Sequence, residues 1–566
     1  MKRFGASVGF LVLLFTAASY AQNGPCASPS GKLACVLPQE YGIGSGGAFN
    51  FTTVLYDAQA GPNAKNFHPQ HFGSDFSSLL GPLTGDIARQ ANLLPIASPS
   101  SGVLLTYDTS LKTFVVSTDS LGPILGERGD TIGRHKLFVG FSYQYFNFDK
   151  IDGVNMRSIP AMLVHRDDNQ DDTPLNTTPT VTCSAAQKST AAQNLGGCAF
   201  VRDLINTQNS IALKVNQYTA YVTFGLTKKI DISAVVPFET VRMSLYSQDT
   251  IIPGSDGSFA PTANSPDATI LNQNVTDSHG APLFLHLFKD CVNTSPAGGV
   301  ADLAAPCTQH TFPDPTWIGT SFTSNGTTVT GTPGTPNGSN AINSASGIGD
   351  VVARVKWNAV SGEHLRVAGG ADVRLPTGDA LNFLGSGSYG VKPFAVLSYR
   401  ARVSPHVLVG YEWNSQSILS SRQSTVTTAT GPSQEIGLAS NRKGYMPSDF
   451  VYSAGADTWI TKWLTAAVDI VGARYFRGGT ESVTSQPFLA PCTSGCTAEP
   501  ATPTVSYNSL NPNFNASYSI TNLSAGAKIR PIPKSKLVIT GNVIVRLDNG
   551  GLHAKPAPLA GIGYTF

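Results

Sequence analysis

Charged residues are scarce in this sequence. Only 13% of its 566 residues are Asp, Glu, Lys or Arg, about half the share that is usual in soluble globular proteins. Small and polar residues, among them 56 Gly, take their place, and they suit strands and polar loops better than helices. This composition argues against a charged cytosolic surface. The formal net charge of +2 gives no reason to expect nucleic acid as a partner.

Long apolar runs are also missing. No segment offers the roughly twenty consecutive apolar residues of a transmembrane helix, so a helical membrane protein is excluded. The compact run from Phe10 to Phe15 is shorter, follows the basic residues Lys2 and Arg3, and precedes small residues that end at Ala21. This order predicts a signal peptide over residues 1–21 and therefore an exported protein.

Recognisable catalytic motifs are a third absence. We find no Gly-Xaa-Ser-Xaa-Gly elbow in a strand-turn-helix setting and no His-Glu-Xaa-Xaa-His helix. We therefore predict that the protein is not an enzyme and has no catalytic residue, metal or cofactor. Asp372 and Asp379 are candidates for calcium chelation, but residues 376–379 (Pro-Thr-Gly-Asp) are more simply a turn.

Cysteines, in contrast, are present in four close pairs. The pairs are Cys26 with Cys35, Cys183 with Cys198, Cys291 with Cys307, and Cys492 with Cys496. Because an exported protein meets an oxidising compartment, we predict local disulfides. Metal binding is the alternative, and it is disfavoured because no pair has His neighbours at ligand spacing.

From about residue 136 onward, strand-like runs alternate with connections. The runs are 136–149, 210–226, 230–246, 348–358, 363–374, 389–401, 406–420, 450–459, 463–479, 515–530, 536–548 and 554–566. Most reach the ~9–11 residues that a tilted strand needs to cross a bilayer. We therefore predict an all-β fold over residues 136–566, an antiparallel transmembrane β-barrel of about 12 strands.

The connections alternate in length. Short ones at 227–229, 403–405 and 531–533 separate long ones at 150–209, 247–347, 375–388, 421–449 and 480–514. Bacterial outer-membrane barrels have short periplasmic turns and long outer loops in this order. An even number of strands also returns the C-terminus to the periplasmic side. The long loops are predicted to be extracellular, either as solvated loops or as surfaces for adhesion.

Alternation with period two supports the same fold. In 348–358, Val355 and Trp357 share one face, while Arg354 and Lys356 share the other. In a barrel the apolar face would meet lipid and the polar face the lumen, whereas a soluble sandwich would exchange them. The last strand alternates in the same way and ends with Tyr564 and Phe566.

Tyr564 and Phe566 resemble the C-terminal assembly signal of bacterial outer-membrane barrels. This resemblance implies binding by the barrel-assembly machinery. Together with the signal peptide, it predicts a location in the outer membrane of a Gram-negative bacterium, with outer-membrane lipid as a partner. Residues 22–135 fit the barrel pattern less well, although 102–106 and 113–118 suggest a hairpin. This N-terminal segment is predicted to be a plug, a periplasmic extension or two further strands, which would make 14.

Several motifs occur together in order. A hairpin at 222–237 (VTFGLTKKIDISAVVP) is followed by 347–357 (GIGDVVARVKW), 375–379 (LPTGD), 385–389 (GSGSY) and Lys392-Pro393. This order resembles the outer-membrane transporter family named for the meta-pathway of phenol degradation, over roughly residues 210–566. That family is distantly similar to the long-chain fatty-acid and aromatic-hydrocarbon channels. The resemblance implies a barrel that transports small, hydrophobic or aromatic solutes.

The candidate functional residues are the charges on the lumen face of the predicted strands. They are Arg354, Lys356, Arg366, Asp372, Lys392, Arg400, Glu412, Asp457, Asp469, Lys528 and Arg546. They would either set up a field that orients solutes and selects ions, or form a ladder of ion pairs that closes a narrow barrel. The predicted function is therefore a channel or transporter for small molecules. The alternative is a closed structural or surface-binding, adhesin-like barrel that acts through its disulfide-bonded loops.

Overall fold

The computed structural model describes only part of the chain. The described residues are 32–37, 55–57, 69–95, 105–108, 113–116, 120–164, 204–252, 286–288, 309–312, 321–324, 327–330, 342–420, 422–424, 434–436, 443–489, 504–532 and 535–566. Among them, no helix is long and apolar enough to cross a membrane.

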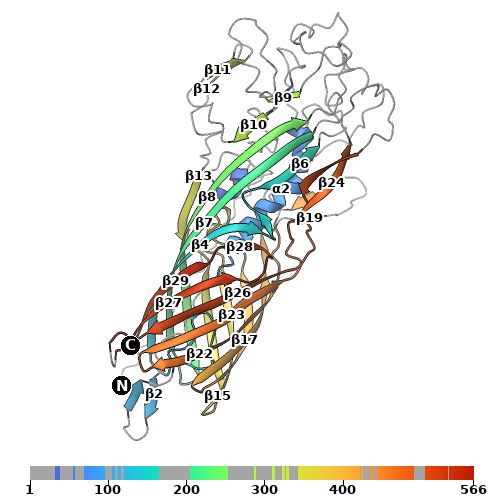
Figure 1. Cartoon of the computed structure of the whole chain (residues 1–566). Helices are drawn as coiled ribbons and strands as arrows, with labels where there is room; N and C mark the ends of the chain where they lie inside the picture. Colours follow the sequence, from blue (N-terminus) through green and yellow to red (C-terminus); the bar gives the residue numbers. More distant parts are fainter. Residues whose placement is uncertain are drawn as a thin grey trace, which may run out of the picture.

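Twelve antiparallel strands close into a barrel (Figure 1). They are β4 (Leu137–Ile151), β7 (Leu204–Gly225), β8 (Ile230–Ile252), β14 (Val351–Ser361), β15 (Leu365–Leu375), β16 (Gly390–Tyr399), β17 (Val403–Asn414), β22 (Asp449–Thr461), β23 (Leu464–Tyr475), β26 (Tyr518–Ile529), β27 (Leu537–Arg546) and β29 (Ala557–Thr565). The barrel closes because β29 pairs with β4, from Leu559 opposite Gln144 to Thr565 opposite Phe138. The predicted fold and the count of twelve strands are confirmed.

The two ends of the barrel differ. Short connections such as 226–229, 400–402 and 462–463 lie at one end, together with the start of β4 and the end of β29. We call this the turn end, and the opposite end, where β7 and β8 extend beyond their neighbours, the loop end (Figure 1). The predicted alternation of short and long connections is therefore present.

Further strands extend the sheet at the loop end. They are β5 (Val154–Asn155), β6 (Ile159–Val164), β10 (Gln309–Phe312), β13 (Ile342–Ile348) and β28 (Leu552–Ala554). Six separate two-stranded sheets are β1 (Leu55–Asp57) with β9 (His286–Phe288), β2 (Leu105–Asp108) with β3 (Thr113–Val116), β11 (Ser321–Ser324) with β12 (Thr327–Thr330), β18 (Gln416–Ser417) with β21 (Gly444–Tyr445), β19 (Arg422–Ser424) with β20 (Gln434–Ile436), and β24 (Val483–Leu489) with β25 (Thr504–Leu510). The hairpin suggested around residues 102–118 is thus β2–β3, and it does not join the barrel.

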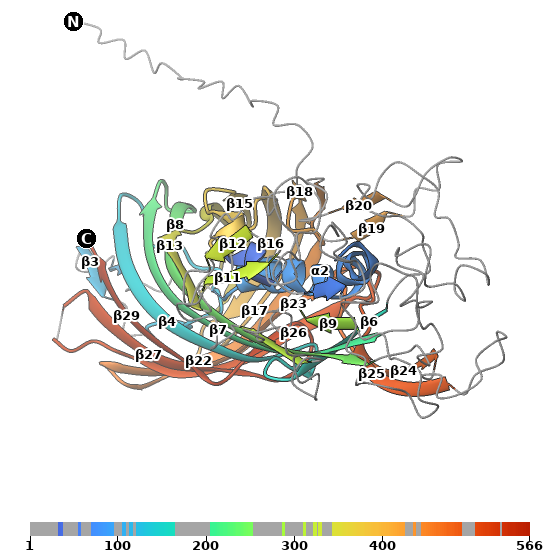
Figure 2. The same cartoon turned by 90° about the horizontal axis from the view of Figure 1, so that it is seen from above.

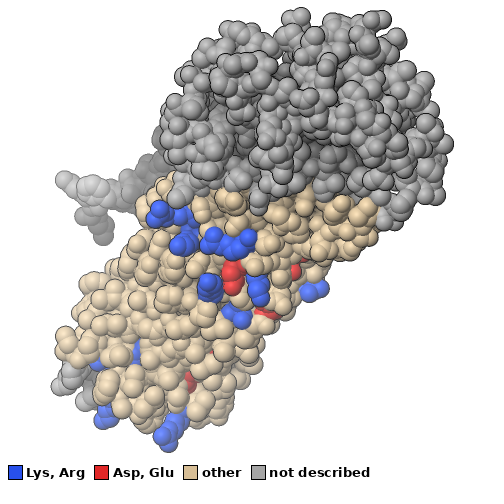
Figure 3. Space-filling view, turned by 45° about the horizontal axis from the view of Figure 1, so that its top comes forward, with Lys and Arg blue, Asp and Glu red and all other residues tan. Residues whose placement is uncertain are grey.

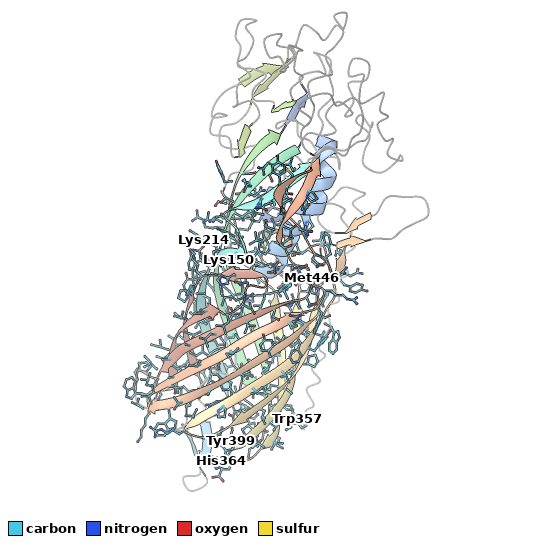
Figure 4. The ribbon with its side chains drawn as sticks, turned by 45° about the vertical axis from the view of Figure 1, so that its right-hand side comes forward. Lys150, Lys214, Trp357, His364, Tyr399 and Met446 are labelled. Carbon is cyan, nitrogen blue, oxygen red and sulfur yellow. The ribbon has the colours of Figure 1, made fainter. Side chains whose placement is uncertain are left out.

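An apolar belt covers the outside of the barrel. Outward side chains such as Val355 and Leu397 are about half exposed, at 51% and 50%. Aromatic residues lie at both edges of the belt: Tyr399 at the turn end (Figure 4) and Tyr389 near the loop end, ten residues away along β16. Ten residues span about 33 Å of strand, or about 25 Å vertically at a tilt of roughly 40°, which is the height of the apolar band on membrane barrels.

The inside of the loop end is apolar and contains a helix. Helix α2 (Pro69–Ala91) lies beside β6 and β28, and its Leu80, Leu83 and Ile87 belong to one apolar core with inward residues of β4, β7 and β8, among them Leu213. Figure 2 shows α2 among the strands rather than outside them. The short helices η1 (Leu33–Cys35) and η8 (Ala380–Asn382) lie beside it. The sequence analysis did not predict α2, although its buried residues follow a helical spacing of three and four.

Candidate functional site

An extended stretch of the N-terminal region lies inside the turn end. We call residues 120–132 the lumen segment. Gly122, Pro123, Gly126 and Gly129 keep this stretch out of regular helix or strand. Its backbone and side chains instead bond to inward groups of seven barrel strands, as the following contacts show.

The first contacts are made with Asp457 on β22, which also lies close to His406 on β17. Arg128 Nε donates to Asp457 Oδ1 over 3.1 Å, and its Nη2 and the Ser120 hydroxyl both donate to Asp457 Oδ2. His406 lies between two carboxylates, with Nε2 2.6 Å from Asp469 Oδ1 and Nδ1 3.6 Å from Asp457 Oδ1. A buried carboxylate needs such partners, and the lumen segment supplies three hydrogen bonds to Asp457, whereas His406 belongs to the barrel wall.

Backbone groups of the lumen segment also bind charges on β23 and β26. The N–H groups of Ile124, Leu125 and Gly126 point at Asp469 Oδ2, at 3.4, 3.2 and 3.1 Å. Gly126 is required for this approach, because a Cβ there would lie 2.5 Å from His406 Nε2. On β26, Lys528 Nζ donates to the carbonyls of Leu121 and Pro123.

Two acids of the lumen segment pair with cations on β14, β15 and at the end of β16. Glu127 accepts from Arg354 and Lys356, each at 2.8 Å. Asp130 lies 2.8 Å from Arg400 and 3.3 Å from Arg366. Beyond them, Ile132 donates its N–H to Asp231 on β8 over 2.9 Å. The lumen segment therefore bonds to opposite walls of the barrel.

Seven of the eleven sequence-predicted residues lie on the barrel wall and contact the lumen segment. They are Arg354, Lys356, Arg366, Arg400, Asp457, Asp469 and Lys528. The other four lie farther toward the loop end and pair elsewhere: Asp372 with Arg354 and Lys392, Glu412 with Arg374, and Arg546 with Asp548. Their predicted role in transport stays a prediction.

The sequence analysis missed His406, Asp231 and Arg374 on the walls, and the charges of the lumen segment itself. A signal for the latter exists, because Glu127, Arg128 and Asp130 form a charged cluster in a glycine-rich stretch just before the first barrel strand. Their partners lie 227 residues or more away in sequence, as Glu127 and Arg354 do. The sequence pattern alone therefore could not show which wall residues pair with Glu127, Arg128 and Asp130.

The other predicted residues have simple settings. Asp379 caps η8 and pairs with Lys32 over 2.6 Å, as a turn residue does. Cys35 is disulfide-bonded, and the other seven cysteines lie outside the described residues, so the predicted pairing stays a prediction. Tyr564 and Phe566 stack edge-to-face with ring centres 4.7 Å apart, exposed at the turn end.

A second charged cluster holds α2 at the loop end. Arg89 pairs with Asp86 over 2.7 Å, and Asp152 accepts N–H bonds from Glu481 and Gly551 at 2.9 and 2.6 Å. Glu481 is only 2% exposed, and neither of its carboxylate oxygens has a hydrogen-bond partner among the described residues. Burial, together with the nearby Asp86 and Asp152, raises the pKa of Glu481 well above its usual range.

Between these contacts lies a cavity of about 270 Å³. Leu93 and Leu94 after α2 line it, as do Leu125 and Glu127 of the lumen segment. Its barrel wall is mixed. Apolar side chains come from Leu408, Val451, Val471 and Ile520, and charged ones from Arg354, Asp372, Arg374, Lys392 and Glu412. A small molecule with an apolar body and a polar group matches this lining.

No protein family matches the chain, and no curated protein is similar to it. Solved structures with some likeness include an outer membrane channel from Pseudomonas putida F1, which is 8% identical with a TM-score of 0.36 and covers 77% of this chain and 97% of that one. A FadL homologue from Pseudomonas aeruginosa is 9% identical with a TM-score of 0.22, covering 76% and 88%. The toluene transporter TbuX of Ralstonia pickettii is 10% identical with a TM-score of 0.21, covering 76% and 89%. At these scores the likenesses carry no inference about function.

Removing the Glu127 carboxylate should loosen the lumen segment. In a Glu127→Ala variant, the buried Lys356 loses its carboxylate partner, and breaking a buried pair in this way costs about 3–5 kcal/mol when water does not compensate. We expect faster hydrogen exchange in residues 120–132 while the barrel strands stay protected. Glu127→Leu with Lys356→Met should restore protection, and Glu363→Ala, an exposed turn residue, is the control. Unchanged exchange in Glu127→Ala would contradict the assigned contact.

Docking of α2 should weaken as the pH rises. Because the pKa of Glu481 is raised in the docked state, that state binds more protons than the released one. The contribution of Glu481 to the free energy of docking is therefore greatest below its ordinary pKa of about 4.3. Docking becomes less favourable as the pH rises through the raised pKa of Glu481 in the docked state. Protection factors of residues 79–91 should fall with increasing pH, and Glu481→Gln should flatten the dependence. An equal slope in both proteins would refute this assignment.

Proposed function

We propose that this protein is an outer-membrane channel of a Gram-negative bacterium for small molecules, closed by its own N-terminal segment. The observation that carries the proposal is the set of contacts between the lumen segment and charged residues on opposite walls. The apolar belt with its aromatic edges supports insertion in a membrane, because a soluble barrel would not leave such a belt exposed.

The chemistry of the lumen segment favours a removable plug. Replacing buried ion pairs by apolar residues often stabilises a protein, so a permanent stopper is better built from apolar contacts. Charged side chains on the inner wall, in contrast, can be hydrated when the lumen segment leaves, because water can replace the hydrogen bonds that the segment made. The polar contacts at the turn end therefore suit a closure that opens.

Release of the lumen segment would expose an inner wall that carries charges of both signs. Arg354, Lys356, Arg366 and Arg400 lie on the side of β14, β15 and β16, and Asp457 and Asp469 lie on β22 and β23. Opposed charges create a field across the lumen that orients dipolar solutes. The cavity lined by both apolar and charged side chains would add apolar contacts to such a solute. The solute class that fits both is a small molecule with an apolar, for example aromatic, body and a polar group.

Single-channel conductance in planar bilayers tests this function. We expect the full-length protein to conduct rarely, and Glu127→Gln with Asp130→Asn to conduct more often, because the segment loses the two acids that neutralise four wall cations. Those currents should prefer anions. A chain lacking residues 22–135 should conduct steadily, and Glu363→Gln should behave as the wild type.

Silence of all these proteins, despite heat-modifiable migration that shows a folded barrel, would sink the channel proposal. That outcome would favour the closed barrel that acts through its outer loops.

A further inference from the structure

Four cations gather on the outer wall at the loop end. Lys214 of β7 is the cross-strand partner of both Arg242 on β8 and Asn147 on β4. Lys555 lies next in the row, because its backbone N–H donates to the Asn147 carbonyl over 3.0 Å. Lys150 follows on β4, and Figure 4 shows it close to Lys214 at this end of the barrel. We call Lys150, Lys214, Arg242 and Lys555 the cationic row.

The cationic row lacks anions of its own. None of its four members forms an ion pair with another residue that the structure describes, and the nearby Asp149 is bonded to His553 over 2.8 Å. Like charges directly opposite on neighbouring strands, as Lys214 and Arg242 are, destabilise a sheet. Figure 3 shows a group of Lys and Arg side chains at the loop end, with an acidic side chain among them, on a wall that is otherwise mostly uncharged. An anion from outside the protein would therefore reduce the repulsion between these cations.

The level of the row relative to the apolar belt identifies the anion. The outward aromatic residues Tyr143, Tyr218 and Phe238 lie four residues nearer the turn end than Asn147, Lys214 and Arg242 on the same strands. Phe238 is 45% exposed. The rings of Tyr143 and Tyr218 contact each other at a tilt, with centres 5.1 Å apart. Aromatic residues mark the membrane interface, and four residues of a tilted strand rise roughly 10 Å. The cationic row therefore lies at the depth of lipid headgroups.

We propose that the cationic row binds the phosphate groups of a phosphorylated glycolipid in the leaflet around the loop end. This inference rests on the proposed outer-membrane location. Lys and Arg form short, charge-assisted hydrogen bonds with phosphate oxygens, and one phosphate between Lys214 and Arg242 would relieve their repulsion. Acyl chains attached to the same headgroup would cover Tyr218 and Phe238. Free phosphate offers no such apolar contact, so a lipid is the fitting ligand.

Lipid retention by the full-length protein tests the proposal. The probe is bis-phosphorylated lipid A, titrated onto the purified protein in detergent and counted by native mass spectrometry. We expect Lys214→Gln with Arg242→Gln to weaken binding about 30-fold, at about fivefold for each cation, and Lys228→Gln with Lys229→Gln at the turn end to change it less than about twofold. Inorganic phosphate at matched concentration should not displace the lipid.

Three results would overturn the proposal: equal binding by the Lys214/Arg242 variant, equal binding of lipid A without phosphates, or displacement by inorganic phosphate. The last would indicate a site for the free anion. Heat-modifiable migration and the conductance of the chain that lacks residues 22–135 separate this inference from the channel function. If that chain conducts but the lipid result fails, only the cationic row is wrongly assigned, and if the lipid binds while that chain stays silent, only the channel is.

Discussion

Neutralisation of charge inside a narrow barrel is the constraint on which the rest of this structure depends. The inner wall at the turn end carries both cations and carboxylates, and each is costly to bury without a partner. The lumen segment meets this need with Glu127, Arg128 and Asp130, and with backbone groups that bind Asp469 and Lys528. Because these partners come from one continuous stretch, its removal would uncover the wall over the whole turn end at once.

The two ends of the lumen are filled by different kinds of contact. At the loop end, α2 packs Leu80, Leu83 and Ile87 into an apolar core, and such packing excludes water. At the turn end, the contacts are hydrogen bonds and ion pairs. Water can therefore replace the contacts at the turn end, whereas α2 is held mainly by apolar burial. The mixed cavity lies where the two kinds of contact meet.

Much of the barrel could be predicted from the sequence, because strand alternation is a local property. Arg354 and Lys356 face inward and Val355 and Trp357 outward for a reason visible within a few residues. The inward face of β7 near Leu213 departs from this rule, because it meets α2 instead of water. The place of the lumen segment was not predictable, since its Gly and Pro residues have no period and the partners of Glu127 and Arg128 are more than 200 residues distant.

The most direct test of a gated lumen is solute flux through a barrel whose lumen segment is tethered. Leu121 and Thr465 lie side by side, with the Leu121 N–H donating to Thr465 Oγ1 over 2.9 Å, so Leu121→Cys with Thr465→Cys should form a reversible tether. Uptake of a small aromatic solute into proteoliposomes should stop when the tether is oxidised and resume on reduction, while each single variant is indifferent to both. Equal uptake in the tethered and released states would contradict closure by the lumen segment.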